Sequence, residues 1–124
     1  MKRGINEHTV VGNVGEDSID RYNGDDAVTS FSVATNEVWK DKKTGEEQSR
    51  TTWHPVVVFG NRAQFAGEVI KKGVEIFVKG PLIDNPWTKE GESKPRERKE
   101  IRITNFDGDF QVMGLGAKPI QENN

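Results

Sequence analysis

The chain has 124 residues, of which 32% are hydrophobic and 31% are charged, and its formal net charge is −2. Its length and low hydrophobic fraction predict one domain with a small core. That charge excludes a uniformly basic nucleic-acid binder, so any binding of nucleic acid must come from local patches and stacking. The lack of cysteine excludes a disulfide framework and thiolate metal sites, and the lack of a signal-peptide core or of an apolar run of roughly 18 residues predicts a cytoplasmic protein without a membrane span.

Residues 1–15 alternate apolar and polar side chains, which predicts a first strand. Gly12 and Gly15 within this segment indicate a bulge or bend, as a strand needs where a barrel curves. The acidic segment 16–26 that follows contains an Asn-Gly pair and predicts a turn or loop.

Residues 27–39 predict a second strand, in which valine and phenylalanine alternate with small polar residues. The polar segment 40–47 contains a glycine and predicts a long hairpin tip. This hairpin would place Trp39 and Trp53 opposite each other across its base, as a cross-strand aromatic pair.

The stretch 50–60 is rich in β-branched and aromatic residues and ends on a glycine, so it predicts the central strand. Side chains alternate between the two faces of a strand, which places Trp53 and Phe59 on one face and His54 on the other. At roughly 3.3 Å per residue the two aromatic rings are about 20 Å apart, which leaves room for several stacked bases. A strand buried on both faces is the alternative.

Between residues 61 and 72 the apolar period changes to three and four residues, which predicts a short helix of about three turns capped by Gly73. The remaining segments predict, in order, a strand at 74–82, a long loop at 84–97 that carries Trp87, a strand at 99–105 and a short final strand at 110–113.

Apart from the short final strand, the order is three strands, a helix and two further strands joined by long loops. This is the order of an OB-fold, a five-stranded Greek-key barrel that binds oligonucleotides or oligosaccharides. We therefore predict an all-β OB-fold over residues 1–115, with one short helix between strands 3 and 4. Residues 116–124 are expected to form a short flexible C-terminal tail.

Several segments carry a resemblance to a known family; in chain order they are Arg3-Gly4-Ile5-Asn6, Val11-Gly12-Asn13-Val14-Gly15, Arg21-Tyr22, Ala34-Thr35-Asn36-Glu37-Val38-Trp39, Thr44-Gly45-Glu46, Thr52-Trp53-His54, Val57-Val58-Phe59-Gly60, Lys72-Gly73, Trp87-Thr88 and Met113-Gly114. Through these segments the chain resembles the bacterial single-stranded DNA-binding protein family over roughly residues 3–115. The resemblance implies an OB-fold, a homotetramer, and sequence-tolerant binding that coats and protects single-stranded DNA in replication, recombination and repair.

The resemblance also implies that bases stack on four aromatic residues, all present here: Trp39, Trp53, Phe59 and Trp87. Aromatic platforms contribute about 1–3 kcal/mol per stacked base without selecting a sequence. Core packing is the alternative role for each of the four. The candidate phosphate-binding residues are Arg3, Lys43, Arg62, Lys72, Arg96 and Arg98.

Several positions that are often basic in the family are not basic here, namely Glu7, Pro55 and the segment 83–86. The run 94–102, with five basic and two acidic residues, is either a replacement phosphate surface or a solvated strand end. Because stacking is retained while charge is reduced, we expect binding that depends less steeply on salt than is usual in the family.

Neither His54 nor His8 has the spacing of a metal site or a catalytic triad. The resemblance implies that His54 lies in a subunit contact, and the low apolar fraction also favours an oligomer. With no P-loop, nucleophile elbow or carboxylate–histidine cluster, the sequence predicts a binding protein that is not an enzyme and has no metal or cofactor.

Two other functions remain open: a primosomal accessory or single-stranded RNA-binding OB protein, and an OB module that only builds oligomers. The family's acidic, phenylalanine-ended tip is not found in residues 117–124. We therefore expect no recruitment of replication proteins through such a tip by this chain.

Overall fold

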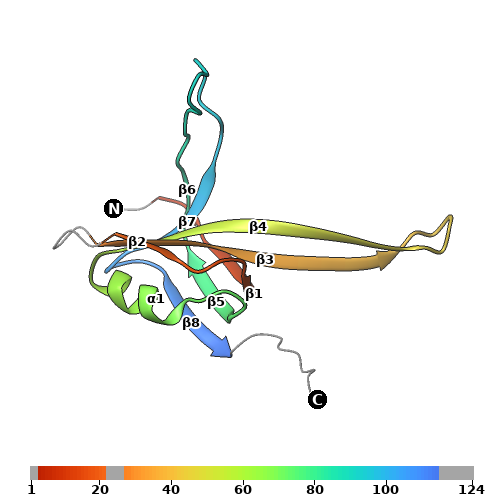
Figure 1. The fold of residues 1–124 in the computed structure, drawn as a ribbon, viewed down its shortest axis with the longest axis horizontal. Coiled ribbons are helices and arrows are strands. Elements are labelled where there is room, and N and C mark those ends of the chain that lie inside the picture. Colours follow the sequence, from red (N-terminus) through yellow and green to blue (C-terminus); the bar gives the residue numbers. More distant parts are fainter. Residues whose placement is uncertain (1–2, 22–26, 115–124) are drawn as a thin grey trace.

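The computed structural model describes residues 3–21 and 27–114, and the predicted tail at 116–124 lies outside them (Figure 1). The elements, in chain order, are β1 (His8–Val14), β2 (Ile19–Arg21), β3 (Val28–Lys40), β4 (Glu47–Phe59), a single 3₁₀ turn (Gly60–Arg62), α1 (Ala63–Val69), β5 (Glu75–Gly80), β6 (Leu82–Asp84), β7 (Lys99–Ile103) and β8 (Asp109–Gly114). The predicted loop at 16–26 thus contains a short strand, β2, which pairs with β3.

The strands form one sheet in the order β6-β7-β4-β3-β1-β5-β8. Pro81, which has no amide hydrogen to donate, divides the predicted strand at 74–82 into β5 and β6. The first half pairs with β1 and the second half pairs with β7, while β7 runs parallel to β4. The two-part strand therefore closes a barrel of β1, β3, β4, β5–β6 and β7, which confirms the predicted OB-fold.

The barrel core consists of alternate side chains from each barrel strand. Its fully buried members from the strands are Val33, Val56, Val58, Ile76, Val78, Ile101 and Ile103. The helix covers one end of the barrel through Ala63, Ala66 and Ile70. The buried hydroxyl of Thr29 donates to the Ala63 carbonyl at 2.6 Å, which satisfies a polar group that would otherwise be costly inside the core.

The helix lies between the third and fourth barrel strands, as predicted, but it is shorter than residues 61–72. It ends at Val69 because Ile70 has an extended backbone (ψ 101°) and turns its side chain into the core. Gly73, predicted as the helix cap, has φ 88° in the turn beyond, where its amide donates to the Val14 carbonyl. Burial of the Ile70 side chain therefore ends the helix before Lys71 and Lys72, which were predicted to form its last turn.

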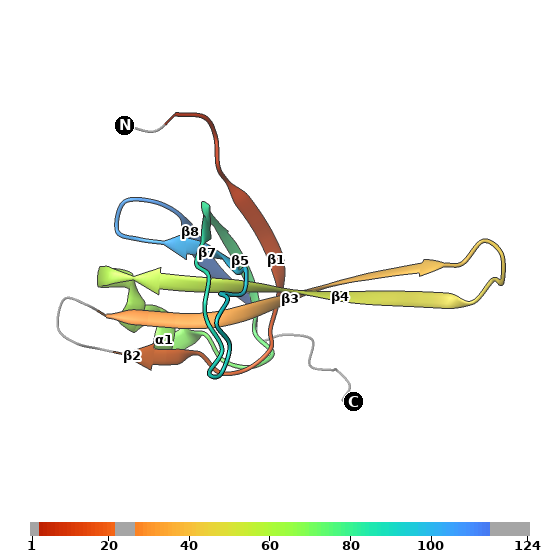
Figure 2. The same ribbon diagram turned by 90° about the horizontal axis from the view of Figure 1, so that it is seen from above.

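Two hairpins leave the barrel in different directions (Figures 1 and 2). The β3–β4 ladder continues to the pair Lys40↔Glu47, so the predicted tip at 40–47 is only a tight turn; we call residues 36–51 the ribbon arm. The predicted loop at 84–97 is also a hairpin, because Trp87 and Arg96 form a β-bridge within it; we call residues 84–99 the β6–β7 arm.

Candidate nucleic-acid interface

Trp53 lies on β4 at the barrel wall, and its side chain is 55% exposed. The ring packs over Gly15, so closely that a Cβ atom on this glycine would lie 2.3 Å from the ring carbon Cζ3. Beside it is a cleft of about 390 Å³ that Ile19, Ser32 and Arg98 help to line. A flat apolar ring next to a guanidinium and an open cleft is a surface on which a base can stack.

Trp39 lies on the ribbon arm and is 44% exposed. The prediction that it pairs with Trp53 is wrong, because the register places Gln48 opposite Trp39 and Ala34 opposite Trp53. The true neighbour is Arg50, one step diagonally across the ribbon, whose guanidinium carbon lies 5.5 Å from the indole centroid. This distance is that of a cation–π contact.

Trp87 lies on the β6–β7 arm and is 43% exposed. Its cross-strand partner is Arg96, whose guanidinium carbon lies 5.5 Å from the indole centroid. The guanidinium donates two hydrogen bonds to the carboxylate of Glu92, at 2.9 and 2.7 Å. This pair lowers the pKa of Glu92 and raises that of Arg96.

Phe59 ends β4, on the face that also carries Trp53, and is half-buried. Arg102, opposite the neighbouring Val57 in the parallel ladder, places its guanidinium carbon 5.4 Å from the phenyl centroid. Arg102 is ion-paired at 3.1 Å with Glu100, which is only 1% exposed. The Nε atom of Arg102 is buried and has no hydrogen-bond partner among the described residues.

The predicted phosphate-binding residues occupy different settings. Arg3, Lys72 and Lys43 are exposed, and Lys43 lies at the tip of the ribbon arm. Arg98 is also exposed and lies beside Trp53. Arg62 instead donates to the carbonyls of Thr104 and Gly108 and pairs with Asp109 at 3.2 Å, so its donors hold the β7–β8 turn against the helix.

Sequence reasoning missed Arg50 and included Arg102 only as part of the basic run 94–102; both lie directly over aromatic rings. Both positions follow from cross-strand neighbour relations, and the register of the β3–β4 hairpin could have revealed the first. The second depends on the parallel β4–β7 pairing, which no local pattern encodes.

Residues 5–109 match the model of the Single-strand binding protein family. The chain belongs to this family. It is similar to a structure described as Plasmodium falciparum SSB in complex with ssDNA, at 31% identity and a TM-score of 0.76, over 91% of this chain and 98% of that chain. It is also similar to a deletion mutant of the single-stranded DNA binding protein from Thermus aquaticus, at 25% identity and a TM-score of 0.69, over 91% of this chain but only 52% of that one.

Membership of the single-strand binding protein family confirms the prediction that the chain is a binding protein and not an enzyme. Within residues 3–21 and 27–114, no cluster of three or more metal-binding side chains occurs. No helix in the part of the chain that the structure describes is long and apolar enough to span a membrane.

His54, which is predicted to lie in a subunit contact, is half-buried near the start of the ribbon arm. Its Nε2 atom is 3.0 Å from the hydroxyl of Thr35, and its ring centroid is 5.5 Å from that of His8. Burial, and to a lesser extent the neighbouring His8, lower the pKa of His54. The lowered pKa favours the neutral form of the ring.

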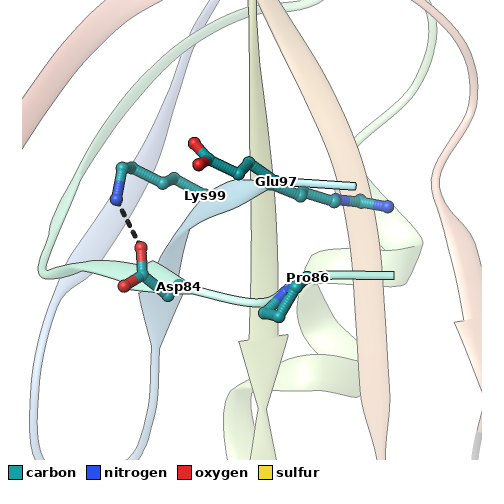
Figure 3. Close-up of a pocket in the computed structure, with 5 residues that line it drawn as sticks. Asp84, Pro86, Glu97 and Lys99 are labelled. Carbon is teal, nitrogen blue, oxygen red and sulfur yellow. Dashed lines mark hydrogen bonds and ion pairs between the residues drawn. The ribbon is translucent and has the colours of Figure 1, made fainter. Parts of the chain in front are cut away.

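The base of the β6–β7 arm holds a cleft of about 240 Å³ that is lined by Asp84, Pro86, Glu97, Arg98 and Lys99 (Figure 3). Asp84 and Lys99 form an ion pair across it, with Pro86 and Glu97 nearby. This pair raises the pKa of Lys99, chiefly through the hydrogen bond to Asp84. The carboxylate of Asp84 thus offsets the positive charge of Lys99.

Proposed function

We propose that this protein binds single-stranded DNA without sequence preference, coating and protecting exposed strands in replication, recombination and repair. The observation that carries the proposal is the exposure of all three tryptophans, at 43–55%, on strands and hairpins that lie outside the core cluster. Indole rings are normally among the most buried surfaces of a domain. Membership of the single-strand binding protein family supports the same function.

The proposed platforms are Trp39, Trp53, Phe59 and Trp87. Every base has a flat π-face, so a ring on the protein surface can stack with any of them. Two basic side chains lie near the rings and would contact the DNA backbone, Arg98 beside Trp53 and Arg96 beside Trp87. The exposed Arg3, Lys43 and Lys72 are the further candidates for phosphate contacts. Stacking is proposed to supply most of the affinity, because the arginines beside Trp39 and Trp87 are already paired with glutamates.

We further propose that the protein acts as a homotetramer in which His54 lies at a subunit contact. A small barrel core and a half-buried, neutral imidazole beside the ribbon arm support this assembly. Light scattering at micromolar concentration tests it: the wild type should have four times the mass of one chain, and His54→Tyr should dissociate on dilution. A monomeric wild type would contradict the assembly without affecting the stacking proposal.

Titration of intrinsic tryptophan fluorescence with oligo-dT tests the binding function. We expect strong quenching, and we expect Trp53→Ala to weaken binding by about 1–3 kcal/mol. A parallel titration with oligo-rU separates DNA from RNA preference, because the 2′-hydroxyl changes the fit. Unchanged fluorescence with either strand would mean that the fold serves only as an oligomerisation module.

A further inference from the structure

Three of the four aromatic platforms share one arrangement: an arginine guanidinium lies over the ring, and a glutamate carboxylate holds that guanidinium. The ring contacts measure 5.4–5.5 Å and the ion pairs 2.7–3.1 Å. We call each such group a tethered platform, and the three are Trp39–Arg50–Glu37, Trp87–Arg96–Glu92 and Phe59–Arg102–Glu100. Among the described residues, Trp53 alone of the four aromatics has no arginine over its ring.

In a tethered platform, the guanidinium takes the place of a base on the ring, and the carboxylate takes the place of a phosphate on the guanidinium. The guanidinium covers a ring face on which a base would stack, and the carboxylate occupies the donors that would bind a phosphate. Carboxylates and phosphates are recognised by the same fork of guanidinium N–H groups. Glutamate and DNA backbone are therefore competitors for one arginine.

Burial separates the three groups. Glu37 and Arg50 are 61% and 63% exposed, and the Glu92–Arg96 pair also lies at the surface. Exposed ion pairs of this kind are weak and screened by water, so they exchange partners readily. Glu100 is almost fully buried and also accepts a hydrogen bond from Asn85 at 2.9 Å, so breaking its pair would leave an uncompensated charge in the protein.

We propose that Glu37 and Glu92 limit the affinity for single-stranded DNA by competing with its phosphates for Arg50 and Arg96. On binding, each arginine leaves its carboxylate for a phosphate, and a base takes the vacated ring face. Arg50 thereby becomes a DNA-binding residue, whereas Arg102 keeps its ion pair with Glu100, so a base that stacks on Phe59 would have to share the ring with this guanidinium. This inference rests on the proposed function.

The test compares two double variants that change the net charge equally. Glu37→Gln/Glu92→Gln removes both carboxylates while keeping side-chain size. Glu68→Gln/Glu75→Gln is the matched control, because both residues are exposed and form none of the ion pairs among the described residues. In low salt we expect the first variant to bind oligo-dT about twofold to fivefold more tightly per pair removed, and the control to change affinity by less than about twofold, the screened effect of distant charges.

A second pair of variants establishes whether the arginines themselves reach phosphate. Arg50→Met/Arg96→Met should weaken binding and reduce the magnitude of the log–log salt slope by about 0.7 per arginine. Adding the two glutamine substitutions to this background should then change affinity no more than the control does. Melting temperatures of all variants should stay near that of the wild type, since every altered side chain is at the surface.

Two outcomes would contradict the inference, and a third would contradict the proposed function. Glutamine variants that bind no more tightly than the control would overturn it, because the carboxylates would not be competitors. Tighter binding by the methionine variants would also overturn it, because the arginines would then only block the rings. A wild type that does not bind oligo-dT at all would instead overturn the proposed function itself.

Discussion

The barrel of this protein buries its apolar side chains around one core, whereas its two arms bury nothing: every residue from 84 to 99 is exposed, and the ribbon arm has no buried residue. The arms are held instead by ladder hydrogen bonds, by tight turns and by cross-strand contacts such as that of Trp87 with Arg96. Stability and binding are therefore expected to depend on different residues, and this separation can be tested.

The largest expected effect is on stability alone. Ile76 on β5 is fully buried, so Ile76→Ala removes contacts from the core and leaves a cavity. We expect the free energy of unfolding to fall by about 2–5 kcal/mol. Denaturant titration measures this loss, and the affinity of the folded fraction for oligo-dT should not change. A large loss of affinity would mean that the core also shapes the interface.

The converse substitution lies on the β6–β7 arm. Trp87→Ala removes an exposed ring, so we expect a loss of about 1–3 kcal/mol in binding free energy. The melting temperature should move little, because Trp87 lies outside the core cluster. The affinity for oligo-dT is measured by fluorescence quenching of the remaining tryptophans. The melting temperature is measured by a thermal scan of the same sample. An unchanged affinity would remove Trp87 from the interface.

Gly15 is where the separation should fail, because this glycine supports the ring of Trp53. Gly15→Ala places a methyl group where the ring lies, so the ring must move. We expect weaker oligo-dT binding, by up to about the 1–3 kcal/mol of one lost stacking contact. The matched control is Gly114→Ala at the end of β8, where no atom lies within 4 Å of the Cβ position, so affinity for oligo-dT is expected to stay unchanged. Equal affinity losses in both variants would contradict the role assigned to Gly15.

A smaller effect is expected at the base of the β6–β7 arm. Asp84→Asn removes the partner of Lys99 and leaves the lysine free to contact phosphate. The log–log salt slope should become steeper by about 0.7. Asn85 is a poorer position for such a test, since its side chain already donates to Glu100. Affinities measured at several salt concentrations decide the point, and an unchanged slope would place Lys99 outside the DNA path.

The smallest expected effect is the dependence of stability on pH through His54. Its pKa is lowered in the folded protein, so below about pH 6.5, the ordinary value for histidine, the unfolded chain binds protons more readily. Stability should thus be complete above about pH 6.5 and decline as the pH falls towards the lowered value. Thermal scans from pH 7.5 to 5.5 should show this decline, and His54→Gln should reduce it. An equal decline in the variant would assign the effect to other groups.

The sequence sufficed for the fold because local patterns and element order agree. Alternation puts Val56 and Val58 on the face opposite Trp53, and the structure buries both; the change of period marks the helix. It did not suffice for the helix end, where burial of Ile70 overrides propensity, nor for Pro81, whose missing amide hydrogen splits a strand. The four aromatics were identifiable, but their arginine neighbours depend on register between strands, which no single segment carries.

The parallel pairing of β4 with β7 has a consequence for how the chain folds. The ribbon formed by β3 and β4 joins neighbouring segments through one tight turn, whereas the pair Val56↔Ile101 must bring together distant parts of the chain. Pairing of distant segments reduces the entropy of the intervening chain before any contacts stabilise the pair, so such pairs form late and slowly. We therefore expect the β3–β4 hairpin to be organised in the transition state and the β4–β7 seam to form after it. Until that seam forms, the inward valines of β4 lie along an open edge, which is when newly made chains are most exposed to association with one another.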